Sequence, residues 1–568
     1  MRDGGPEAER VVVELSKRRK LVFGEPFFVP GVPIAIDRHG LGEAGPGDLV
    51  VARTGRGRAR VERVLGPAGH IESVLEGLLY ARGERGAHER HEPPAQNMGG
   101  RVDLRELSTL TIDPDTAKDF DDAISIEREG DGLRAWVHIA DVSYFVPVGT
   151  PLDQGAADRG FSVYVPGRVS PMLPTDLADD LCSLRPHEDR LAVTVEIPFD
   201  AGLEPGQPSF YRSVIRSDAR LTYAEAEAAL AGRHAMEGAI GQTLERAERL
   251  TLELRRRRFA RGALRIQSAE VTFAFDGEGG VARAWLEAEP HAHMLVEELM
   301  ILANEAVASL LAGRRRESLY RVHDPPEPQS VSNLISVFSE LEVPMPPAPD
   351  TDRLTSASAA RLVAEISDRV SDYIRRSGRG VAAFPPLVLR SLKQARYDPR
   401  NLGHSGLASP AYCHFTSPIR RFSDNICHRA LLRELGLSDE PLPEDLPGLA
   451  EHLSAREREA AAVEYQADAI CLAWLLNATL FEQGWESTFE GEITGVIASG
   501  IFVRFGEVFE GYVPARRMPG DYFELNPLGT RLVGRRGGRS YRLGDPIKVR
   551  VEKIERAEGK VELALAGT

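Results

Sequence analysis

Four aspartates crowd the segment TLTIDPDTAKDFDDAISIE: Asp113, Asp119, Asp121 and Asp122. Carboxylates a few Å apart raise each other's pKa, so such a cluster is unfavourable unless a divalent cation neutralises it. Hard oxygen ligands suit Mg²⁺ or Mn²⁺, and two such ions could hold a phosphodiester for in-line hydrolysis. The alternative is an acidic turn at a solvated surface, and Asp115, in the Asp-Pro-Asp turn, fits that description.

The flanks of the aspartate cluster indicate two strands. Residues 109–112 and 123–126 have the alternation of strands, so the cluster occupies a strand end, a proline turn and the start of the next strand. On an extended segment Asp119 and Asp121 point to one face and Asp122 points to the other.

A second segment, HFTSPIRRFSDNICHRALL at 414–432, could bind phosphate. Pro418 predicts a turn, Ser417 a helix cap, and Arg420 and Arg421 then fall in the first helical turn. Because the dipole at a helix N-terminus favours anions, a phosphate held by the helix end and a guanidinium explains the arrangement. An arginine pair on the surface is the alternative.

Two further segments carry candidate contacts. In RGFSVYVPGRVSPMLPTDLADDLCSLRP (159–186) the prolines predict a rigid loop that presents Tyr164, which could stack on a terminal base or pack half-buried. In the helix MLVEELMILANEAV, one of Glu297 and Glu298 must face the core or a cleft, where a ligand or an arginine could partner it. Exposure of both glutamates on the helix surface is the alternative.

The composition is that of a globular protein with several domains. Of 568 residues, 42% are hydrophobic and 27% charged, and this length predicts three or four domains. The sequence has no apolar run of about 18 residues and no secretory signal, so we expect a cytoplasmic protein with no membrane contact. The four cysteines lack C-x-x-C spacing, which predicts reduced, buried thiols rather than zinc ligands or disulfides.

The net charge of −15 argues against binding nucleic acid through an overall basic surface. A basic channel inside an acidic shell stays possible, because basic runs occur at 17–20, 255–258, 314–316 and 531–542. Each such run is also typical of a solvated helix face.

The succession of strand and helix patterns predicts an α+β multidomain protein. Residues 1–20 form a polar extension, short strands over 21–70 predict a small β-barrel, and 71–100 is a linker. Residues 101–484 form a central mixed α/β domain, and five strands within 485–568 predict an OB-type barrel.

Within the central domain the sequence predicts one hairpin and four helical regions. The hairpin turns at Gly130–Gly132. Helical periodicity covers 223–261, 293–311 and 353–376, and a long helix over 454–481 begins at a Ser-x-x-Glu capping box.

The C-terminal barrel could bind single-stranded nucleic acid. OB barrels stack bases on outward-facing aromatic rings while arginines follow the phosphates. The candidate stacking residues, some of which must fill the core, are Phe489, Phe502, Phe505, Phe509 and Tyr512. An insertion supplies the candidate phosphate contacts: Arg531, Arg535, Arg536, Arg539 and Arg542.

Together these segments resemble the ribonuclease II / ribonuclease R (RNB) family of exoribonucleases. The resemblance rests on TIDPDTAKDFDDAIS, HIADVSYFV, SVYVPGRVSPMLP with DDLCSLRP, VEELMILANEAV, YRVHDPP and HFTSPIRRFSD, in that order across 101–484. The C-terminal barrel looks like the S1-type RNA-binding domain of that family, and residues 21–70 look like its cold-shock domain. The resemblance implies a processive, Mg²⁺-dependent 3′-to-5′ exoribonuclease, with Mn²⁺ as a possible substitute, that hydrolyses single-stranded RNA to nucleoside 5′-monophosphates in RNA turnover.

The resemblance also implies roles for individual residues. Tyr164 matches the tyrosine that stacks on the 3′-terminal base, and Arg420 matches the arginine that contacts the phosphate of the departing nucleotide. Glu298 falls where an acidic residue could help to position the terminal nucleotides. The aspartates that match the family's metal-binding and catalytic set are Asp113, Asp119, Asp121 and Asp122.

The chain departs from the family pattern in two places. Members often carry two cold-shock-type barrels, whereas only 21–70 has that pattern here, and the lysine-rich tail common in ribonuclease R is absent. These departures leave open the subtype and the unaided degradation of structured RNA. The alternative function is a catalytically inactive RNA-binding regulator, against which the four retained aspartates count. We expect a monomer.

Overall fold

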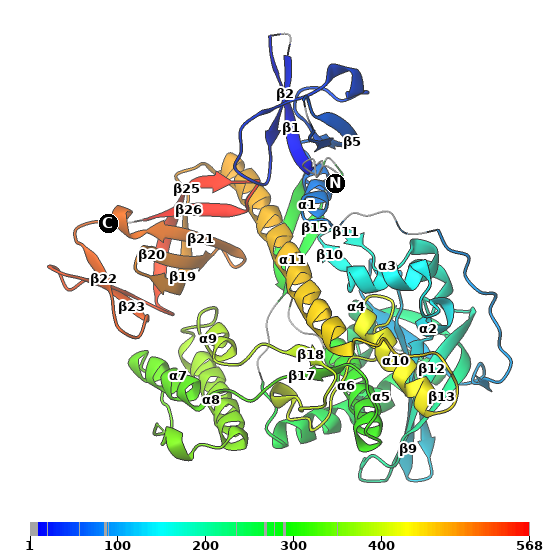
Figure 1. Ribbon diagram of the computed structural model, residues 1–568. Coiled ribbons are helices and arrows are strands. Elements are labelled where there is room, and N and C mark those ends of the chain that lie inside the picture. Colours follow the sequence, from blue (N-terminus) through cyan, green and yellow to red (C-terminus); the bar gives the residue numbers. More distant parts are fainter. Residues whose placement is uncertain are drawn as a thin grey trace.

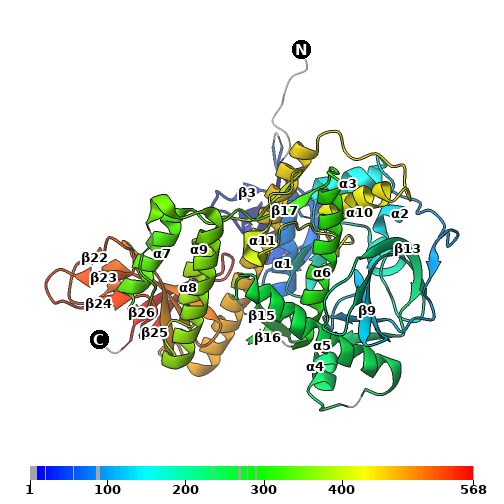
Figure 2. The ribbon, with the colours of Figure 1, turned by 90° about the horizontal axis from the view of Figure 1, so that it is seen from below.

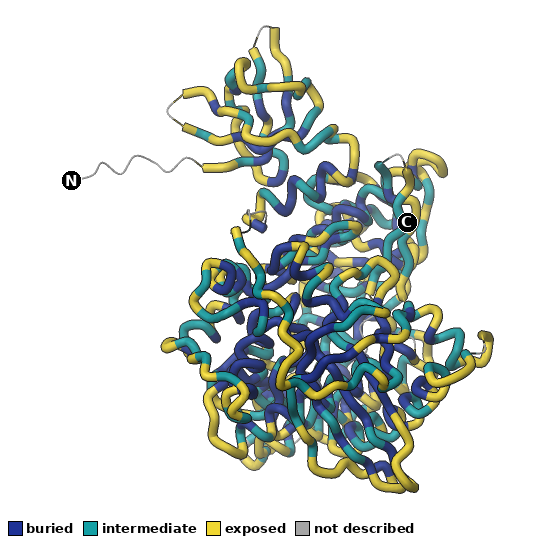
Figure 3. The backbone as a smooth tube through the Cα atoms, turned by 90° about the vertical axis from the view of Figure 1, so that its right-hand side faces the viewer, coloured by how far each residue is buried: buried dark blue, intermediate teal, exposed yellow. Residues whose placement is uncertain are grey.

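The computed structural model describes residues 9–19, 21–55, 57–84, 88, 90–234, 236–265, 270–277, 279–287, 291–348 and 350–566. Figure 1 shows a large mixed unit on one side of a long helix, α11 (Leu446–Gln483), and a C-terminal barrel on the other. A smaller N-terminal β unit lies at the top of the same view. Buried backbone is concentrated in the large unit (Figure 3).

The N-terminal unit is an antiparallel sheet in the order β3-β2-β1-β4-β5. Its strands are β1 (Arg10–Arg18), β2 (Leu21–Pro26), β3 (Ile34–Ala35), β4 (Asp48–Arg53) and β5 (Arg60–Pro67). A bridge between Ile36 and Ala59 joins the two ends of the sheet. The predicted extension over 1–20 is wrong for β1, because its apolar residues Val13 and Leu15 are buried in the centre of this sheet.

The predicted linker over 71–100 is also wrong in part, because it contains the helix α1 (Ile71–Ala81). Its apolar residues recur at helical spacing and form a buried face. The guanidinium of Arg82, just after the helix, donates to Gln466 Oε1 of α11 at 2.6 Å. This helix therefore attaches the N-terminal sheet to the rest of the molecule.

The large unit is built on a sheet in the order β14-β7-β8-β9-β12-β13-β6. Its strands are β6 (Val102–Asp103), β7 (Leu110–Asp113), β8 (Asp122–Glu129), β9 (Gly132–Ala140), β12 (Asp189–Phe199), β13 (Ser209–Arg216) and β14 (Ala219–Thr222). The five inner strands are antiparallel, whereas β14 and β6 pair in parallel at the two edges. The predicted hairpin joins β8 to β9, with Glu129 opposite Gly132.

Hydrophobic cores cover both faces of this sheet. One face carries α4 (Tyr223–Leu230), α5 (Gly238–Ala260) and α6 (His291–Gly313), which lie together in Figure 2. The other carries α2 (Val142–Phe145), α3 (Pro151–Arg159), a π-helical turn (Leu177–Leu181), the hairpin of β10 (Val163–Val165) and β11 (Arg168–Ser170), and part of α11. The single helix predicted over 223–261 is two helices, because Gly232 adopts a left-handed φ of 68° just after α4.

The long helix α11 begins earlier than predicted. Asp445 caps it by accepting the Gly448 N–H at 2.8 Å. Ser454 lies inside the helix, where its hydroxyl donates to Ala450 O and accepts the N–H of Tyr397, so the predicted capping box is wrong. At about 1.5 Å per residue, the 38 residues of α11 span roughly 57 Å.

Smaller elements surround this helix. They are α7 (Pro328–Glu340), α8 (Ser356–Ser377), α9 (Phe384–Arg390), α10 (Phe422–Glu434), the hairpin of β15 (Glu270–Phe275) and β16 (Val281–Glu287), and the pair β17 (Tyr320–Val322) and β18 (Arg396–Asp398). Figures 1 and 2 show α7, α8 and α9 together beside the C-terminal barrel.

The C-terminal barrel is closed, in the order β19-β20-β21-β26-β25. Its strands are β19 (Thr488–Ile497), β20 (Gly500–Phe505), β21 (Phe509–Pro514), β25 (Pro546–Glu555) and β26 (Lys560–Leu565). The insertion forms a sheet of its own from β22 (Phe523–Leu525), β23 (Arg531–Gly534) and β24 (Ser540–Arg542). The predicted α+β multidomain architecture, with a β-rich N-terminal unit and a C-terminal OB barrel, is confirmed.

Two predictions about composition can be compared with the structure. The four cysteines are all buried and free, as expected: Cys182, Cys413, Cys427 and Cys471. In the described part of the chain, no helix combines the length and the apolar character needed to cross a bilayer.

Candidate active site

The four aspartates lie where β7 ends and β8 begins. Asp113 is the last residue of β7 and Asp122 the first of β8, while Asp119 and Asp121 belong to the connection between them. Ser183 fixes that connection, since its hydroxyl accepts the N–H of Phe120 at 3.0 Å and donates to a neighbouring carbonyl. The strand–turn–strand predicted from the sequence is therefore the element that positions the cluster.

Burial makes Asp113, Asp121 and Asp122 hard to ionise. It raises the pKa of Asp113 to about 7, with Asp122 adding to the shift. It raises the pKa of Asp122 to about 6, against the opposing effect of Arg420 and Arg421. Burial also raises the pKa of Asp121 well above its ordinary range, although Arg420 lowers it. The cluster therefore favours a cationic partner.

Arg420 stands beside the most buried of these aspartates. Its Nε lies 3.6 Å from Asp121 Oδ2, and the backbone N–H of Ile419 donates to Asp121 Oδ1 at 2.8 Å. The Asp121 residue is only 4% exposed, whereas the Arg420 side chain is 46% exposed. The guanidinium can thus meet an incoming anion while one end of it faces the carboxylate.

The helix end near Arg420 differs from the prediction. Helix α10 begins at Phe422, with Arg421 at the cap position and no side-chain cap, so Ser417 is not the cap. Asp424, in the first turn, accepts the Ser417 N–H at 2.7 Å and pairs with Arg421 at 2.8 Å. Because this carboxylate occupies the helix end and pairs with Arg421, Arg420 is the more accessible arginine of the segment, and its contact with phosphate stays a prediction.

Tyr164 joins the site from β10, a short strand rather than the predicted loop. Its phenol donates to Asp119 Oδ2 at 2.5 Å, and its backbone N–H donates to Glu464 Oε1 of α11 at 2.8 Å. The ring is therefore held from both ends, against one of the aspartates.

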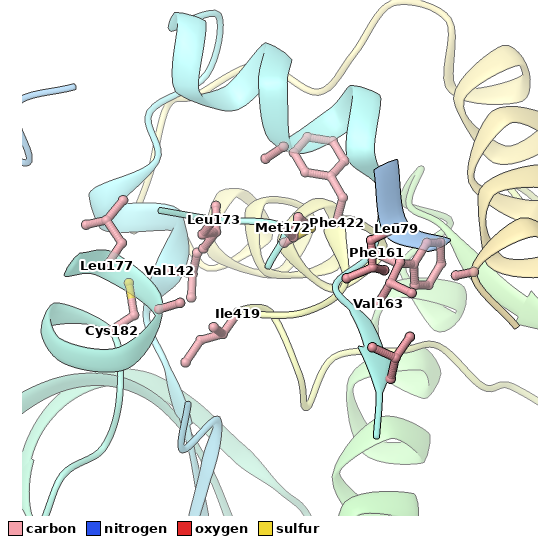
Figure 4. Close-up of a cluster of buried hydrophobic side chains, with 14 of the residues drawn as sticks. Leu79, Val142, Phe161, Val163, Met172, Leu173, Leu177, Cys182, Ile419 and Phe422 are labelled. Carbon is pink, nitrogen blue, oxygen red and sulfur yellow. The ribbon is translucent and has the colours of Figure 1, made fainter. Parts of the chain in front are cut away.

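Backbone hydrogen bonds tie the segments of Tyr164 and Arg420 together. The N–H of Ser162 donates to Arg420 O at 2.9 Å, and the N–H of Phe422 donates to Gly160 O at 2.9 Å. Phe161 and Arg421 form a bridge between these two contacts. Figure 4 shows the side chains of Phe161, Val163, Ile419 and Phe422 in the hydrophobic cluster to which both segments contribute.

Glu298 lies apart from these contacts, in a buried ion pair. It is 2% exposed, and the Arg258 Nε donates to its carboxylate at 3.1 Å. Glu297 is more exposed and lies 3.6 Å from the same guanidinium. The sequence alternative of an arginine partner is thus correct, and contact of Glu298 with RNA stays a prediction.

The structure adds residues that the sequence did not indicate. Tyr223 lies close enough to Asp113 and Asp122 for their charges to raise its pKa, after the larger effect of burial. Thr222, the residue before it, pairs with Asp113 in the parallel ladder of β14 and β7. Arg220 holds the aspartate turn by donating to the Asp115 carbonyl at 2.9 Å. A local sequence pattern cannot predict the pairing of two strands, β7 and β14, that lie about a hundred residues apart.

Two carboxylate oxygens are suited to a cation. Asp113 Oδ2 and Asp121 Oδ2 are buried without a hydrogen-bond partner. Among the described residues, however, no three His, Cys, Asp or Glu side chains converge as a complete metal site. This donor set fits Mg²⁺, which is commonly held by one or two carboxylates and takes its other ligands from water and substrate phosphate.

The C-terminal barrel presents fewer of the predicted contacts than its sequence suggested. Phe505 and Phe509 are core residues, whereas Phe502 is 45% exposed and contacts Tyr512 at a tilt, with ring centroids 5.1 Å apart. Three insertion arginines pair with acidic side chains instead of standing free: Arg531 with Glu340, Arg535 with Glu524, and Arg542 with Glu342. Two of these pairs fasten the barrel to α7 and the residues after it.

Comparisons with known proteins agree with this geometry. Residues 101–436 match the family model described as the RNB domain, and residues 484–566 match the S1 RNA binding domain. The chain is 36% identical over 494 residues to ribonuclease R of Escherichia coli, covering 84% of this chain and 58% of that protein. It is 39% identical over 485 residues to ribonuclease R of Aquifex aeolicus, covering 84% and 66%. The chain thus spans less than two thirds of the length of these relatives.

A solved structure shows the same fold. It is that of Mycoplasma genitalium RNase R in complex with ribose methylated single-stranded RNA, with a TM-score of 0.86 and 24% identity. The alignment covers 99% of this chain and 90% of that one.

Proposed function

The chain belongs to the RNB family, and we propose that it is a processive 3′-to-5′ exoribonuclease that hydrolyses single-stranded RNA to nucleoside 5′-monophosphates in RNA turnover. Its resemblance to two ribonuclease R proteins at 36% and 39% identity supports this activity. The C-terminal S1 domain supports RNA as the substrate.

The observation that carries the proposal is the contact between Tyr164 and the aspartate cluster. The phenol touches Asp119 at 2.5 Å, and the Arg420 guanidinium stands 3.6 Å from Asp121. A base stacked on Tyr164 would place its phosphate between the guanidinium and the carboxylates. The bond cut is then the one nearest the RNA end that reaches the ring, which is the behaviour of an exonuclease.

Each polar group of the site has a task in this reaction. Nucleases of the RNB family depend on a metal ion, and we propose Mg²⁺, with Mn²⁺ able to replace it. Asp113, Asp119, Asp121 and Asp122 would hold such a cation, which would supply a lower pKa for the attacking water and polarisation of the phosphate. Arg420 stabilises charge that develops on the phosphate oxygens, and its charge requires no proton transfer. Tyr164 orients the terminal nucleotide.

Glu298 also has a proposed role. We propose that Glu298, through its pair with Arg258, helps to position the terminal nucleotides.

The four free, buried cysteines suit a reducing compartment, which supports the cytoplasm as the place of action. A monomer presents all the residues invoked above, since they belong to one chain.

One assay tests the activity. Poly(A) labelled at its 5′ end is incubated with the protein and Mg²⁺, with and without EDTA. A ladder that shortens from the 3′ end, and that EDTA abolishes, supports the proposal. Binding without cleavage would favour an inactive RNA-binding regulator, and internal cuts would exclude the exonuclease.

A further inference from the structure

An exposed tyrosine lies between the C-terminal barrel and the candidate active site. Tyr465, near the middle of α11, keeps 70% of its surface exposed. We propose that Tyr465 is a base-stacking residue that holds single-stranded RNA on its way from the barrel to the aspartate cluster. This inference rests on the proposed function and assigns one more substrate contact to it.

On one side, Tyr465 adjoins the active site through the residue before it. Glu464 accepts the backbone N–H of Tyr164 at 2.8 Å, and the phenol of Tyr164 reaches Asp119. Tyr465 therefore belongs to the same turn of α11 as Glu464, which binds the backbone of Tyr164.

On the other side, Tyr465 adjoins the outer face of the barrel. Its phenol lies close enough to Arg504 of β20 and Glu510 of β21 to interact with both charges. These two residues face each other across the strands, with N and O atoms 2.8 Å apart. Phe502 and Tyr512 form the next outward-facing pair along the same two strands.

The barrel is fixed against α11 close to this point. Gly559, in the turn between β25 and β26, approaches the backbone of Ala469 so closely that a Cβ there would lie 2.6 Å from it. The Arg556 guanidinium lies over the Trp474 ring, 4.8 Å from its centroid. The barrel strands β21, β25 and β26 thus lie against α11, beside the stretch of helix that carries Tyr465 (Figure 1).

The charges beside Tyr465 explain why an aromatic ring is needed there. Glu464 and Asp468 are both acidic and interact with each other, with Glu270 as a third acidic neighbour. Such a stretch attracts phosphate only weakly, since Arg504, the cation beside Tyr465, is itself paired with Glu510. Stacking can hold the strand at this point, because every base has a π-face and the interaction needs no charge.

The test measures binding of the full chain in an Asp121→Asn background, so that RNA is not consumed. The probe is 5′-fluorescent oligo(A), and the dissociation constant is measured by anisotropy over a series of salt concentrations. Tyr465→Ala should weaken binding about 5- to 150-fold, the equivalent of about 1–3 kcal/mol for one stacked base. Tyr465→Phe, which keeps the ring, should bind like the parent.

The salt series separates stacking from electrostatic contact. A neutral ring releases no counterions, so Tyr465→Ala should leave the slope of log Kd against log salt unchanged. Phe481→Ala is the matched control, because Phe481 is an 86% exposed aromatic residue of the same helix, sixteen positions further along. It should bind RNA like the parent.

Three results would overturn the inference. They are binding of Tyr465→Ala within twofold of the parent at every salt concentration, an equal loss in Phe481→Ala, and a loss accompanied by a changed salt slope. If wild type gives the exonuclease ladder while Tyr465→Ala binds normally, only the stacking role fails. If wild type neither binds nor cleaves RNA, the proposed function fails and the stacking role fails with it.

Discussion

Asp121 is the carboxylate on which turnover should depend most. It is 4% exposed, and its Oδ1 accepts the Ile419 N–H at 2.8 Å. Asparagine has the same shape and keeps an oxygen for that hydrogen bond. Asp121→Asn therefore removes the charge at Oδ2, which lies 3.6 Å from Arg420 Nε, and little else.

The size of the effect follows from Coulomb's law. Two unit charges about 4 Å apart interact by about 4 kcal/mol at an effective dielectric constant of about 20. If Asp121→Asn removes one such interaction between the Asp121 carboxylate and a neighbouring positive charge in the transition state, turnover slows by about a thousandfold, since each 1.36 kcal/mol is roughly a factor of ten. RNA affinity should stay close to wild type, because Tyr164 and Arg420 remain in place.

The same substitution should not weaken the fold at neutral pH. Burial raises the pKa of Asp121, which means that its ionised form is unfavourable in the folded protein. Asparagine carries no charge to bury, so the melting temperature should equal or exceed that of wild type. Lost activity with retained stability is the expected signature of a functional carboxylate.

Single-turnover cleavage of 5′-labelled poly(A) under saturating Mg²⁺ measures the loss of turnover, and anisotropy with the same RNA measures the RNA affinity. Asp115→Asn is the matched control, because Asp115 is an exposed residue of the same turn. Cleavage by Asp121→Asn within about tenfold of wild type, a barrier change of only roughly 1.4 kcal/mol, would refute the assignment.

Three further predictions follow from side-chain contacts. Tyr164→Ala should weaken binding of the 3′ end by about 5- to 150-fold in anisotropy, whereas Tyr164→Phe, which keeps the ring, should not; equal losses would contradict stacking. Glu298→Ala leaves the buried Arg258 with only the more distant Glu297 as partner, so urea unfolding should show a loss of up to about 3–5 kcal/mol, with a smaller loss for Glu297→Ala. Burial raises the pKa of Asp468 from 3.8 to about 6, with Glu464 and Glu270 adding to the shift. Its protonated form therefore stabilises the fold below pH 3.8, and that contribution is lost as pH rises through 6. Asp468→Asn should accordingly be more stable than wild type above pH 6, by about 1 kcal/mol after allowance for its partial exposure, and the difference in melting temperature should vanish near pH 4.

Local sequence patterns predicted the elements that carry the site. The aspartate strand–turn–strand was recognisable because apolar alternation and a proline turn are properties of neighbouring residues. The same kind of pattern failed at Ser417, where a carboxylate seven positions later, Asp424, takes over the helix end. It also failed at Ser454, whose motif is satisfied equally well inside a helix.

Local sequence patterns did not predict the contacts between segments that are distant in the sequence. Tyr223 comes to the aspartates through a parallel strand pairing, and Glu464 comes to Tyr164 across three hundred positions. The insertion arginines were predicted to contact phosphate, and Arg531 and Arg542 pair with Glu340 and Glu342 of a distant segment. Charge type is visible in a sequence, whereas the partner of a charge is decided by tertiary packing.

The short ladder between the segments of Tyr164 and Arg420 has a consequence for protein engineering. Ser162, Phe161 and Gly160 are hydrogen-bonded or bridged to Arg420, Arg421 and Phe422, so the two segments have a single shared register. A chimera in which one exchanged segment differs in length would break this register and displace the other segment. Transfer of substrate preference between relatives should therefore succeed only when residues 159–172 and 414–424 are exchanged as one cassette.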